Sequence, residues 1–341
     1  MERDLKKTLK AHLDRRDFLK LIGVLSIGFA KPAFSFPLQD ILFDKKLHKL
    51  ERTLPLMDTV VTITVYDSSV DKGKEAIELG FLEMKRLINI FNRYESGTQI
   101  SHLNEDGILK DVPEEMHFVM QKAAYYHHLS NGAFDITVKP IVDLFKDRFK
   151  AGSPPPIKEI KEALTLVDSN SLYFDKNNIK FLKNDMGITL DGIAKGYIVD
   201  KTAELIKKMG IKYALINAGG DIRAIGDKYF RIAIRNPFEP NDYIETINLK
   251  DAAIATSGNY ERYFDKEKRF YHIVDPKTGK SPLKLSSISV IAKTVTDADA
   301  ISTAAFVFSP LLAKRFIEST RASALIITRK GFQIRSKGRI S

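Results

Sequence analysis

Residues 189–221 read TLDGIAKGYIVDKTAELIKKMGIKYALINAGGD, and this stretch predicts a helix followed by a strand. Its apolar residues recur at helical spacing from Ile193 to Met209, and Gly210 is a typical C-terminal helix cap. The apolar run Tyr213–Ala218 predicts a strand, and Gly219-Gly220 predicts a tight turn after it. The stretch therefore predicts a domain in which helices and strands are mixed.

The sequence on both sides continues this mixture. Before residue 189, the predicted elements are a linker or short helix over residues 36–53, a strand over Met57–Tyr66, helices over Lys72–Phe91, Pro113–Leu129 and Thr137–Phe149, a proline-rich surface loop over Ala151–Ile157, and a hairpin from Leu172–Phe174 and Ile179–Leu182. After residue 221, they are strands over Arg231–Arg235, Tyr243–Leu249, Ala252–Ala255, Ser287–Ala292, Ala324–Thr328 and Phe332–Arg335, and helices over Asp297–Phe308 and Leu311–Glu318. Their order is not a strict βαβ alternation, which favours an α+β fold over a doubly wound parallel sheet.

The N-terminal residues 1–35 have the order of an export signal. A basic region is followed by the apolar run Leu21–Ala30, which is too short to cross a bilayer, and by the cleavage-like pattern Ala33-Phe34-Ser35. The pair Arg15-Arg16, followed by Phe18-Leu19-Lys20, resembles a twin-arginine signal, whose cargo is exported folded. We expect a protein in the periplasm or on the outer face of the cytoplasmic membrane, where an uncut signal would act as an anchor. The alternative is a basic amphipathic helix of the mature protein.

Composition narrows the chemistry further. The 341 residues contain no Cys, which excludes disulfides, thiolate metal sites, a catalytic Cys and a lipid-modified N-terminal Cys. The formal net charge is +11, but residues 1–35 hold eight Lys/Arg against four acidic residues, so over a third of it belongs to the signal. The remaining basic residues form no run interleaved with aromatics, which argues against nucleic-acid binding.

Four segments carry residues suited to chemistry, and each also has a plain structural explanation. The Gly192–Tyr197 loop could bind phosphate at a helix N-terminus or simply hold a pair of helix-packing glycines, and Asn217–Asp221 could be only a turn. His272 could be a base or a structural histidine. Asp299 and Thr303 would share a helix face and suit Mg²⁺, although Thr296 with Asp299 also fits a capping box, the explanation that the segment alone favours.

In this order the segments resemble the ApbE family, the FAD:protein FMN transferases. The resemblance runs from about Met57 to about Phe308. It is carried by Met57-Asp58-Thr59, Phe91–Tyr94 with Ser101–Asn104, Gly132–Val138, Gly192–Tyr197, Asn217–Asp221, Ala255–Gly258, His272–Pro276 and Asp299–Thr303. It implies a mixed α/β, ApbE-like (T-fold-like) single catalytic domain over residues 54–341. Enzymes of the family cleave the FAD pyrophosphate and pass FMN to a Ser or Thr hydroxyl of a partner protein, releasing AMP.

The resemblance also implies roles for individual residues. FAD would contact Met57, Tyr94, Ala133, Phe134, Asp135, Thr189, Lys195 and Val274. Mg²⁺ would be held by the Gly192 carbonyl, Asp299 and Thr303, with Ser302 nearby. His272 matches the position that assists proton transfer. Oxygen ligands of this kind suit Mg²⁺ better than zinc.

Three departures from the family pattern stand out. Asp58 replaces the Gly of Met-Gly-Thr, and Thr189-Leu190-Asp191 stands where the family has Asp-Leu-Gly. The FAD-contacting Asp of the family thus falls on Thr189, and Asp191 is the candidate to replace it, either at FAD or as a metal ligand. Periplasmic members are often lipoproteins, whereas here the twin-arginine signal would replace the lipid anchor.

Three functions are compatible with these residues. The first is the Mg²⁺-dependent FMN transferase, whose partners would be FAD and an acceptor flavoprotein subunit, such as a membrane or periplasmic redox protein. The second is a non-catalytic flavin-binding or electron-carrier protein, which needs no metal beside the pyrophosphate. The third is an FAD pyrophosphatase that gives FMN and AMP with water as acceptor.

Overall fold

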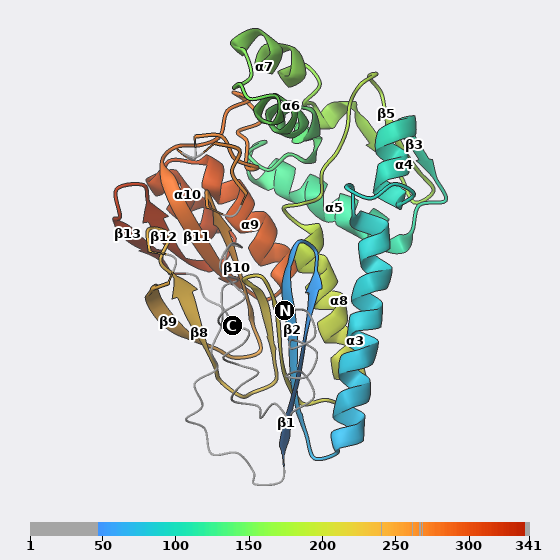
Figure 1. Ribbon diagram of the computed structural model, residues 1–341, viewed down its shortest axis with the longest axis vertical. Helices are drawn as coiled ribbons and strands as arrows, with labels where there is room; N and C mark the ends of the chain where they lie inside the picture. Colours follow the sequence, from blue (N-terminus) through green and yellow to red (C-terminus); the bar gives the residue numbers. More distant parts are fainter. Residues whose placement is uncertain (1–46, 240, 261, 266, 268, 338–341) are drawn as a thin grey trace, which may run out of the picture. The chain divides into compact units, whose positions relative to one another are not determined.

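The computed structural model describes residues 47–239, 241–260, 262–265, 267 and 269–337 (Figure 1). The predicted export signal and residues 36–46 of the predicted linker lie outside this part of the chain. Contacts group residues 34–341 into one unit, and every described residue belongs to it. Within the described residues, no helix is both long and apolar enough to cross a membrane.

An eight-stranded antiparallel sheet forms the centre of the fold, in the order β1-β2-β6-β7-β10-β11-β12-β13 (Figure 1). The strands are β1 (His48–Leu56), β2 (Thr59–Asp67), β6 (Tyr213–Ala218), β7 (Asp221–Ile225), β10 (Ala253–Gly258), β11 (Leu285–Ala292), β12 (Ser323–Thr328) and β13 (Gln333–Ser336). Because the strand pairs are antiparallel and the helices are not regular crossovers, the fold is α+β, as the sequence predicts.

The two faces of this sheet are covered differently. Alternate residues of β6 separate, so that Ala214 and Ile216 join one core while Leu215 joins the other. The first face packs against α3 (Val70–Phe91), α8 (Ala194–Lys208) and α9 (Val295–Val307), with α10 (Pro310–Ser319) beside α9. The second face is covered by a hairpin of β8 (Phe230–Arg235) and β9 (Tyr243–Leu249). Burial on both faces explains the near-continuous apolar runs of the central strands.

The remaining elements pack together at one end of the helical layer. They are α4 (Gln99–Asp106), α5 (Glu114–Leu129), η1 (Ile136–Val138), α6 (Lys139–Lys150), α7 (Ile157–Leu164), η2 (Ser169–Ser171) and a small sheet of β3 (Ile108–Lys110), β5 (Asn178–Phe181) and β4 (Leu172–Phe174). A small core there joins α6 to Ile160 of α7 and to Val274. Of these elements, η1 and α6, with the residues just before η1, supply one wall of a cavity.

Most predicted elements are confirmed, and the differences have physical causes. The predicted linker is wrong over residues 48–53, which belong to β1 and pair with β2. The helix predicted from Thr137 begins at Lys139, so Pro140 lies in the first turn, where its missing N–H is not needed. Helices α4 and α7 were not predicted from the sequence. Both are only eight residues long.

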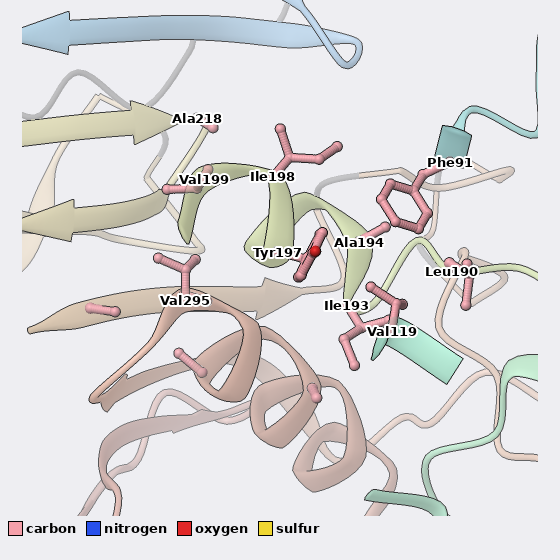
Figure 2. Packing of buried hydrophobic residues seen from close by; sticks show 14 of the residues in the cluster. Phe91, Val119, Leu190, Ile193, Ala194, Tyr197, Ile198, Val199, Ala218 and Val295 are labelled. Carbon is pink, nitrogen blue, oxygen red and sulfur yellow. The ribbon is translucent and has the colours of Figure 1, made fainter. Parts of the chain in front are cut away.

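Helices α8 and α9 approach each other closely at their N-termini. Figure 2 shows the first turns of α8 beside the start of α9, with Val199 of α8 next to Val295 of α9. A Cβ on Gly196 would lie 2.6 Å from the carbonyl oxygen of Val295 and 2.8 Å from the nitrogen of Thr296. Gly196 is therefore a helix-packing glycine, and the contact places the loop before α8 beside α9.

Candidate active site

A cavity of about 360 Å³ opens at the end of the sheet where the helix layer meets α5, η1 and α6. It is lined by the β1–β2 turn, the end of α3, η1 with the residues just before it, α6, the segment that enters α8, the β6–β7 turn, β10, Arg262, residues 272–274 and α9. The sequence-predicted site residues that line it are Met57, Tyr94, Ala133, Phe134, Asp135, Thr189, Asp191, Gly192, Lys195, His272, Val274, Asp299 and Thr303. Segments more than 200 residues apart in the chain thus meet at one site.

Tyr94 stands at the rim of this cavity and is held in place by charged groups. Its hydroxyl donates to Asp191 Oδ2 at 2.7 Å and accepts from Arg93 Nη2 at 3.0 Å. The Arg93 guanidinium also lies 4.4 Å from the centre of the Tyr94 ring, a cation–π distance. Burial opposes ionisation of Asp191, but the charge of Arg93 and the Tyr94 hydrogen bond hold the pKa of Asp191 below its usual range. Asp191 therefore fixes the orientation of Tyr94.

Asp58 and Asp191, the two acids that depart from the sequence pattern, both pair with arginines at the rim of the cavity. Asp58 has a positive φ of 55° in the tight β1–β2 turn, a conformation that Asp tolerates better than most residues. Arg262 Nη2 lies 3.3 Å from Asp58 Oδ2, and Arg262 Nη1 donates to the Tyr94 hydroxyl at 3.3 Å. Asp58 and Asp191 thus both belong to a network centred on Tyr94.

Helix α9, which carries Asp299 to the site, has a well-defined N-terminus. Thr294 is the N-cap and accepts from the N–H of Asp297 at 3.1 Å. The buried Asp200 of α8 accepts from the N–H groups of Val295 at 2.9 Å and Thr296 at 2.8 Å. The capping box predicted from Thr296 and Asp299 is therefore wrong, because the helix begins earlier than the sequence pattern indicates.

Asp299 is instead buried without a full set of partners. The residue is 7% exposed, and its Oδ2 has no hydrogen-bond partner among the described residues. Burial, with the nearby charge of Asp221, raises the pKa of Asp299 well above its usual value. A buried carboxylate of this kind is costly unless a cation or proton accompanies it.

Oxygen atoms suited to Mg²⁺ surround Asp299. Thr303 lies one helical turn later and lines the same cavity, and a Cβ on Gly192 would lie 3.0 Å from Thr303 Oγ1, so Gly192 adjoins that hydroxyl. Carboxylate, hydroxyl and carbonyl oxygens are the ligands of hard cations. The described residues include no cluster of three or more His, Cys, Asp or Glu side chains suited to a metal. The residues therefore fit a hard cation held by mixed oxygen ligands.

Ser302 is placed differently from the other predicted metal-site residues. It is fully buried, and its hydroxyl lies 3.0 Å from the carbonyl oxygen of Asp299 and 2.8 Å from Ser257 Oγ. Ser257 lines the cavity and lies 3.4 Å from Thr303 Oγ1. Ser302 thus supports the site from behind and is not among the residues that line it.

His272 also lines the cavity, on the segment between β10 and β11. Its Nδ1 is 3.1 Å from the carbonyl oxygen of Arg262, which can only accept, so Nδ1 carries the proton and Nε2 is the acceptor nitrogen. Burial lowers the pKa of His272 to about 4, and the charges of Arg262 and Lys195 act in the same direction. His272 is therefore neutral near pH 7 and able to accept a proton.

Comparison with known proteins gives this site a family. The model of the ApbE family matches residues 57–327. The chain belongs to the ApbE family. Among curated relatives, an FAD:protein FMN transferase of Treponema pallidum is 27% identical over 248 residues, covering 66% of this chain and 68% of the relative. One of Haemophilus influenzae is 29% identical over 263 residues, covering 71% and 76%.

Solved structures agree with the family. The crystal structure of the ApbE protein of Thermotoga maritima matches with a TM-score of 0.78 at 31% identity, covering 85% of this chain and 97% of that one. A flavin transferase ApbE of Vibrio cholerae matches with a TM-score of 0.74 at 23% identity, covering 85% and 97%. The second likeness concerns the fold alone. The mixed α/β fold of this chain is therefore the ApbE fold.

Sequence reasoning missed several residues of this ApbE site. They are Arg93 and Arg262, which hold Tyr94, Asp200, which caps α9, Ser257, which contacts Ser302, and Asp221, whose Oδ2 lies 3.2 Å from Lys195 Nζ. Asp221 follows a glycine pair, and a plain turn explains that pair as well as a functional site does. Asp200 is an acid on the buried face of α8, whose other buried residues are mostly apolar, and that placement was a usable signal.

Proposed function

We propose that this chain transfers the FMN part of FAD to a Ser or Thr hydroxyl of an acceptor protein, in a Mg²⁺-dependent reaction that releases AMP. Membership of the ApbE family and the names of the curated relatives support an FAD:protein FMN transferase. The observation that carries the proposal is that one cavity is lined both by the buried carboxylate of Asp299, whose Oδ2 has no hydrogen-bond partner among the described residues, and by the neutral histidine His272.

Different residues of the cavity would have different roles in the reaction. Gly192, Asp299 and Thr303 would hold Mg²⁺, which supplies positive charge to the pyrophosphate when bound. Tyr94, fixed by Asp191 and two arginines, offers a rigid aromatic face at the rim for a flat ring of the substrate. Lys195 lies beside Asp221 on the cavity wall and offers a further positive charge for phosphate.

His272 provides the proton acceptor. The acceptor hydroxyl oxygen forms a bond to the phosphorus of the FMN moiety, and the bond from that phosphorus to the AMP oxygen breaks. The hydroxyl proton passes to Nε2 of His272, and AMP leaves with the electron pair of the broken bond. A histidine with a pKa of about 4 is ready for this step at neutral pH, because it is already deprotonated.

We place this activity outside the cytoplasm, in the periplasm or on the outer face of the cytoplasmic membrane, with a redox flavoprotein subunit as acceptor. The support is the sequence order of residues 1–35, which lie outside the described part of the chain. Replacing Arg15 and Arg16 together by Lys in the full-length chain should retain it in the cytoplasm. Unchanged fractionation would contradict export by the twin-arginine route.

One experiment tests the transferase. The mature protein is incubated with FAD, Mg²⁺ and a candidate acceptor, and the acceptor is examined by mass spectrometry while AMP is measured. An FMN adduct on a Ser or Thr, formed with equimolar AMP and prevented by EDTA, is the expected result. AMP without an adduct would indicate the pyrophosphatase instead, and intact FAD that co-purifies with the protein would indicate a carrier.

A further inference from the structure

Lys195 and Asp221 form an ion pair inside the cavity that no role assigned so far explains. Lys195 lies in the first turn of α8, and its Nζ is 3.2 Å from Oδ2 of Asp221. Asp221 is the first residue of β7, is 2% exposed and is fixed by its pairing with Ala218 of β6. The backbone that carries the carboxylate is therefore fixed in the sheet, whereas the lysine is on a flexible stem with its side chain 31% exposed.

Charge is not balanced in this part of the cavity. Asp221 and Asp299 are both more than nine-tenths buried and interact electrostatically, and both line the cavity together with Lys195. One ammonium group faces two carboxylates, and Oδ2 of Asp299 has no hydrogen-bond partner among the described residues. The site is therefore built for more positive charge than Lys195 alone provides.

We propose that Lys195 competes with the divalent cation for Asp221 and Asp299. In the FAD-free protein, the Lys195 ammonium partly neutralises the two carboxylates. When FAD binds, Lys195 turns to the substrate phosphates and Asp221 becomes a ligand of the cation. This inference rests on the proposed function, because it uses the cation site at Asp299. It adds Asp221 to that site and gives Lys195 a second role. It also makes cation binding and FAD binding mutually favourable, since the phosphates draw Lys195 away.

The proposal predicts an effect of unusual sign. Removing a positive charge next to a cation site strengthens cation binding, because two like charges a few ångströms apart repel strongly in a poorly solvated cavity. Lys195→Met should therefore increase the affinity of the FAD-free protein for a divalent cation by about tenfold. Asp221→Asn should lower that affinity by about tenfold or more, since a ligand or its near neighbour is lost.

The experiment measures Mn²⁺ binding to the FAD-free full chain by electron paramagnetic resonance and by calorimetry. Lys146→Met is the matched control for the lysine, because Lys146 is exposed at the rim, 5.5 Å from the Tyr94 ring. Asp143→Asn is the control for the carboxylate, because Asp143 does not line the cavity, although it pairs with Arg93, which does, and with Lys139. Both controls should bind Mn²⁺ like the wild type. A thermal melt of each variant, with Lys195→Gln as a second replacement, verifies folding.

The outcomes separate this inference from the proposed function. Wild-type binding of Mn²⁺, tightened by Lys195→Met and weakened by Asp221→Asn, supports the competition. Wild-type binding with unchanged or weaker affinity in folded Lys195→Met and Lys195→Gln overturns the competition but leaves the cation site standing. Absence of Mn²⁺ binding to the wild type, with and without FAD, would overturn the cation site itself and with it this part of the proposed function.

Discussion

Asp297 and Asp299 lie two residues apart on α9 and face different surroundings. Asp297 borders an open groove of about 580 Å³ between α5 and the start of α9. It accepts from Lys122 Nζ at 2.9 Å and from the Tyr126 hydroxyl at 2.7 Å, and its burial is outweighed so that the pKa of Asp297 is lowered. Asp299 borders the smaller cavity, where its Oδ2 has no partner among the described residues and its pKa is raised.

The difference shows which observation identifies a site. The groove is larger and exposes the apolar side chains of Phe118, Tyr125 and Leu129, but its carboxylate is already paired. The cavity is smaller, yet it holds two buried carboxylates, Asp221 and Asp299, beside the single ammonium of Lys195. A buried charged group that lacks a full set of partners, rather than a large cavity volume, therefore indicates where a charged ligand binds. The following predictions test this contrast between the two faces of α9.

The largest effect is expected from Asp299→Asn. Turnover should fall by at least about a hundredfold, because the cation site loses its carboxylate. The FAD-free protein in EDTA should melt at a higher temperature than the wild type, since one of two buried carboxylates that share the single ammonium of Lys195 is removed. Assays of AMP release and thermal melts measure both. Unchanged turnover, or a clearly lower melting temperature, would mean that Asp299 only supports the fold.

His272→Gln should have the next largest effect. Transfer should slow by about a hundredfold while FAD binding, measured by flavin fluorescence, changes little. The wild-type pH profile provides the sharper test. With a pKa of about 4 instead of 6.5, His272 stays neutral as the pH falls from 7 to 5, so the rate should hold over that range. A wild-type rate that halves near pH 6.5 would contradict the effect of burial on this residue.

The same shift affects stability, with a sign that follows from proton binding. Between pH 6.5 and 4 the unfolded chain binds a proton at His272 and the folded chain does not, so this contribution to stability is lost as the pH falls through that window. The stability of His272→Gln should therefore depend less on pH there than that of the wild type. Parallel curves for the two proteins would show that His272 titrates normally in the fold.

The sequence predicted the site residues that lie on one motif or one helix better than the ion pairs that join distant segments. Residues near one motif, such as Gly192 and Lys195, or one helical turn apart, such as Asp299 and Thr303, have positions that local spacing determines. The pairings of Arg93 with Asp191 and of Arg262 with Asp58 join segments far apart in the chain, and only the fold brings them together. No pattern within a single segment of the sequence predicts such an ion pair.

Strand β1 escaped prediction for a different reason. It is an edge strand whose residues are mostly exposed on both sides, so its sequence lacks the alternation that identifies a half-buried strand. The start of α9 was misplaced because Thr294 and Thr296 are both reasonable caps. Asp200, on another helix, binds Thr296 and so leaves Thr294 to cap the helix.

The smallest effect is expected from Asp297→Asn, the isosteric change on the other face of α9. It removes the ion pair with Lys122 and a negative charge in the first helical turn, so the free energy of unfolding should fall by about 1 kcal/mol. Turnover and Mn²⁺ affinity should stay within about twofold of the wild type, because Asp297 faces the groove. Urea melts and the AMP assay measure these quantities. A loss of turnover comparable with that of Asp299→Asn would show that the two faces of α9 act together, and the contrast between them would then fail.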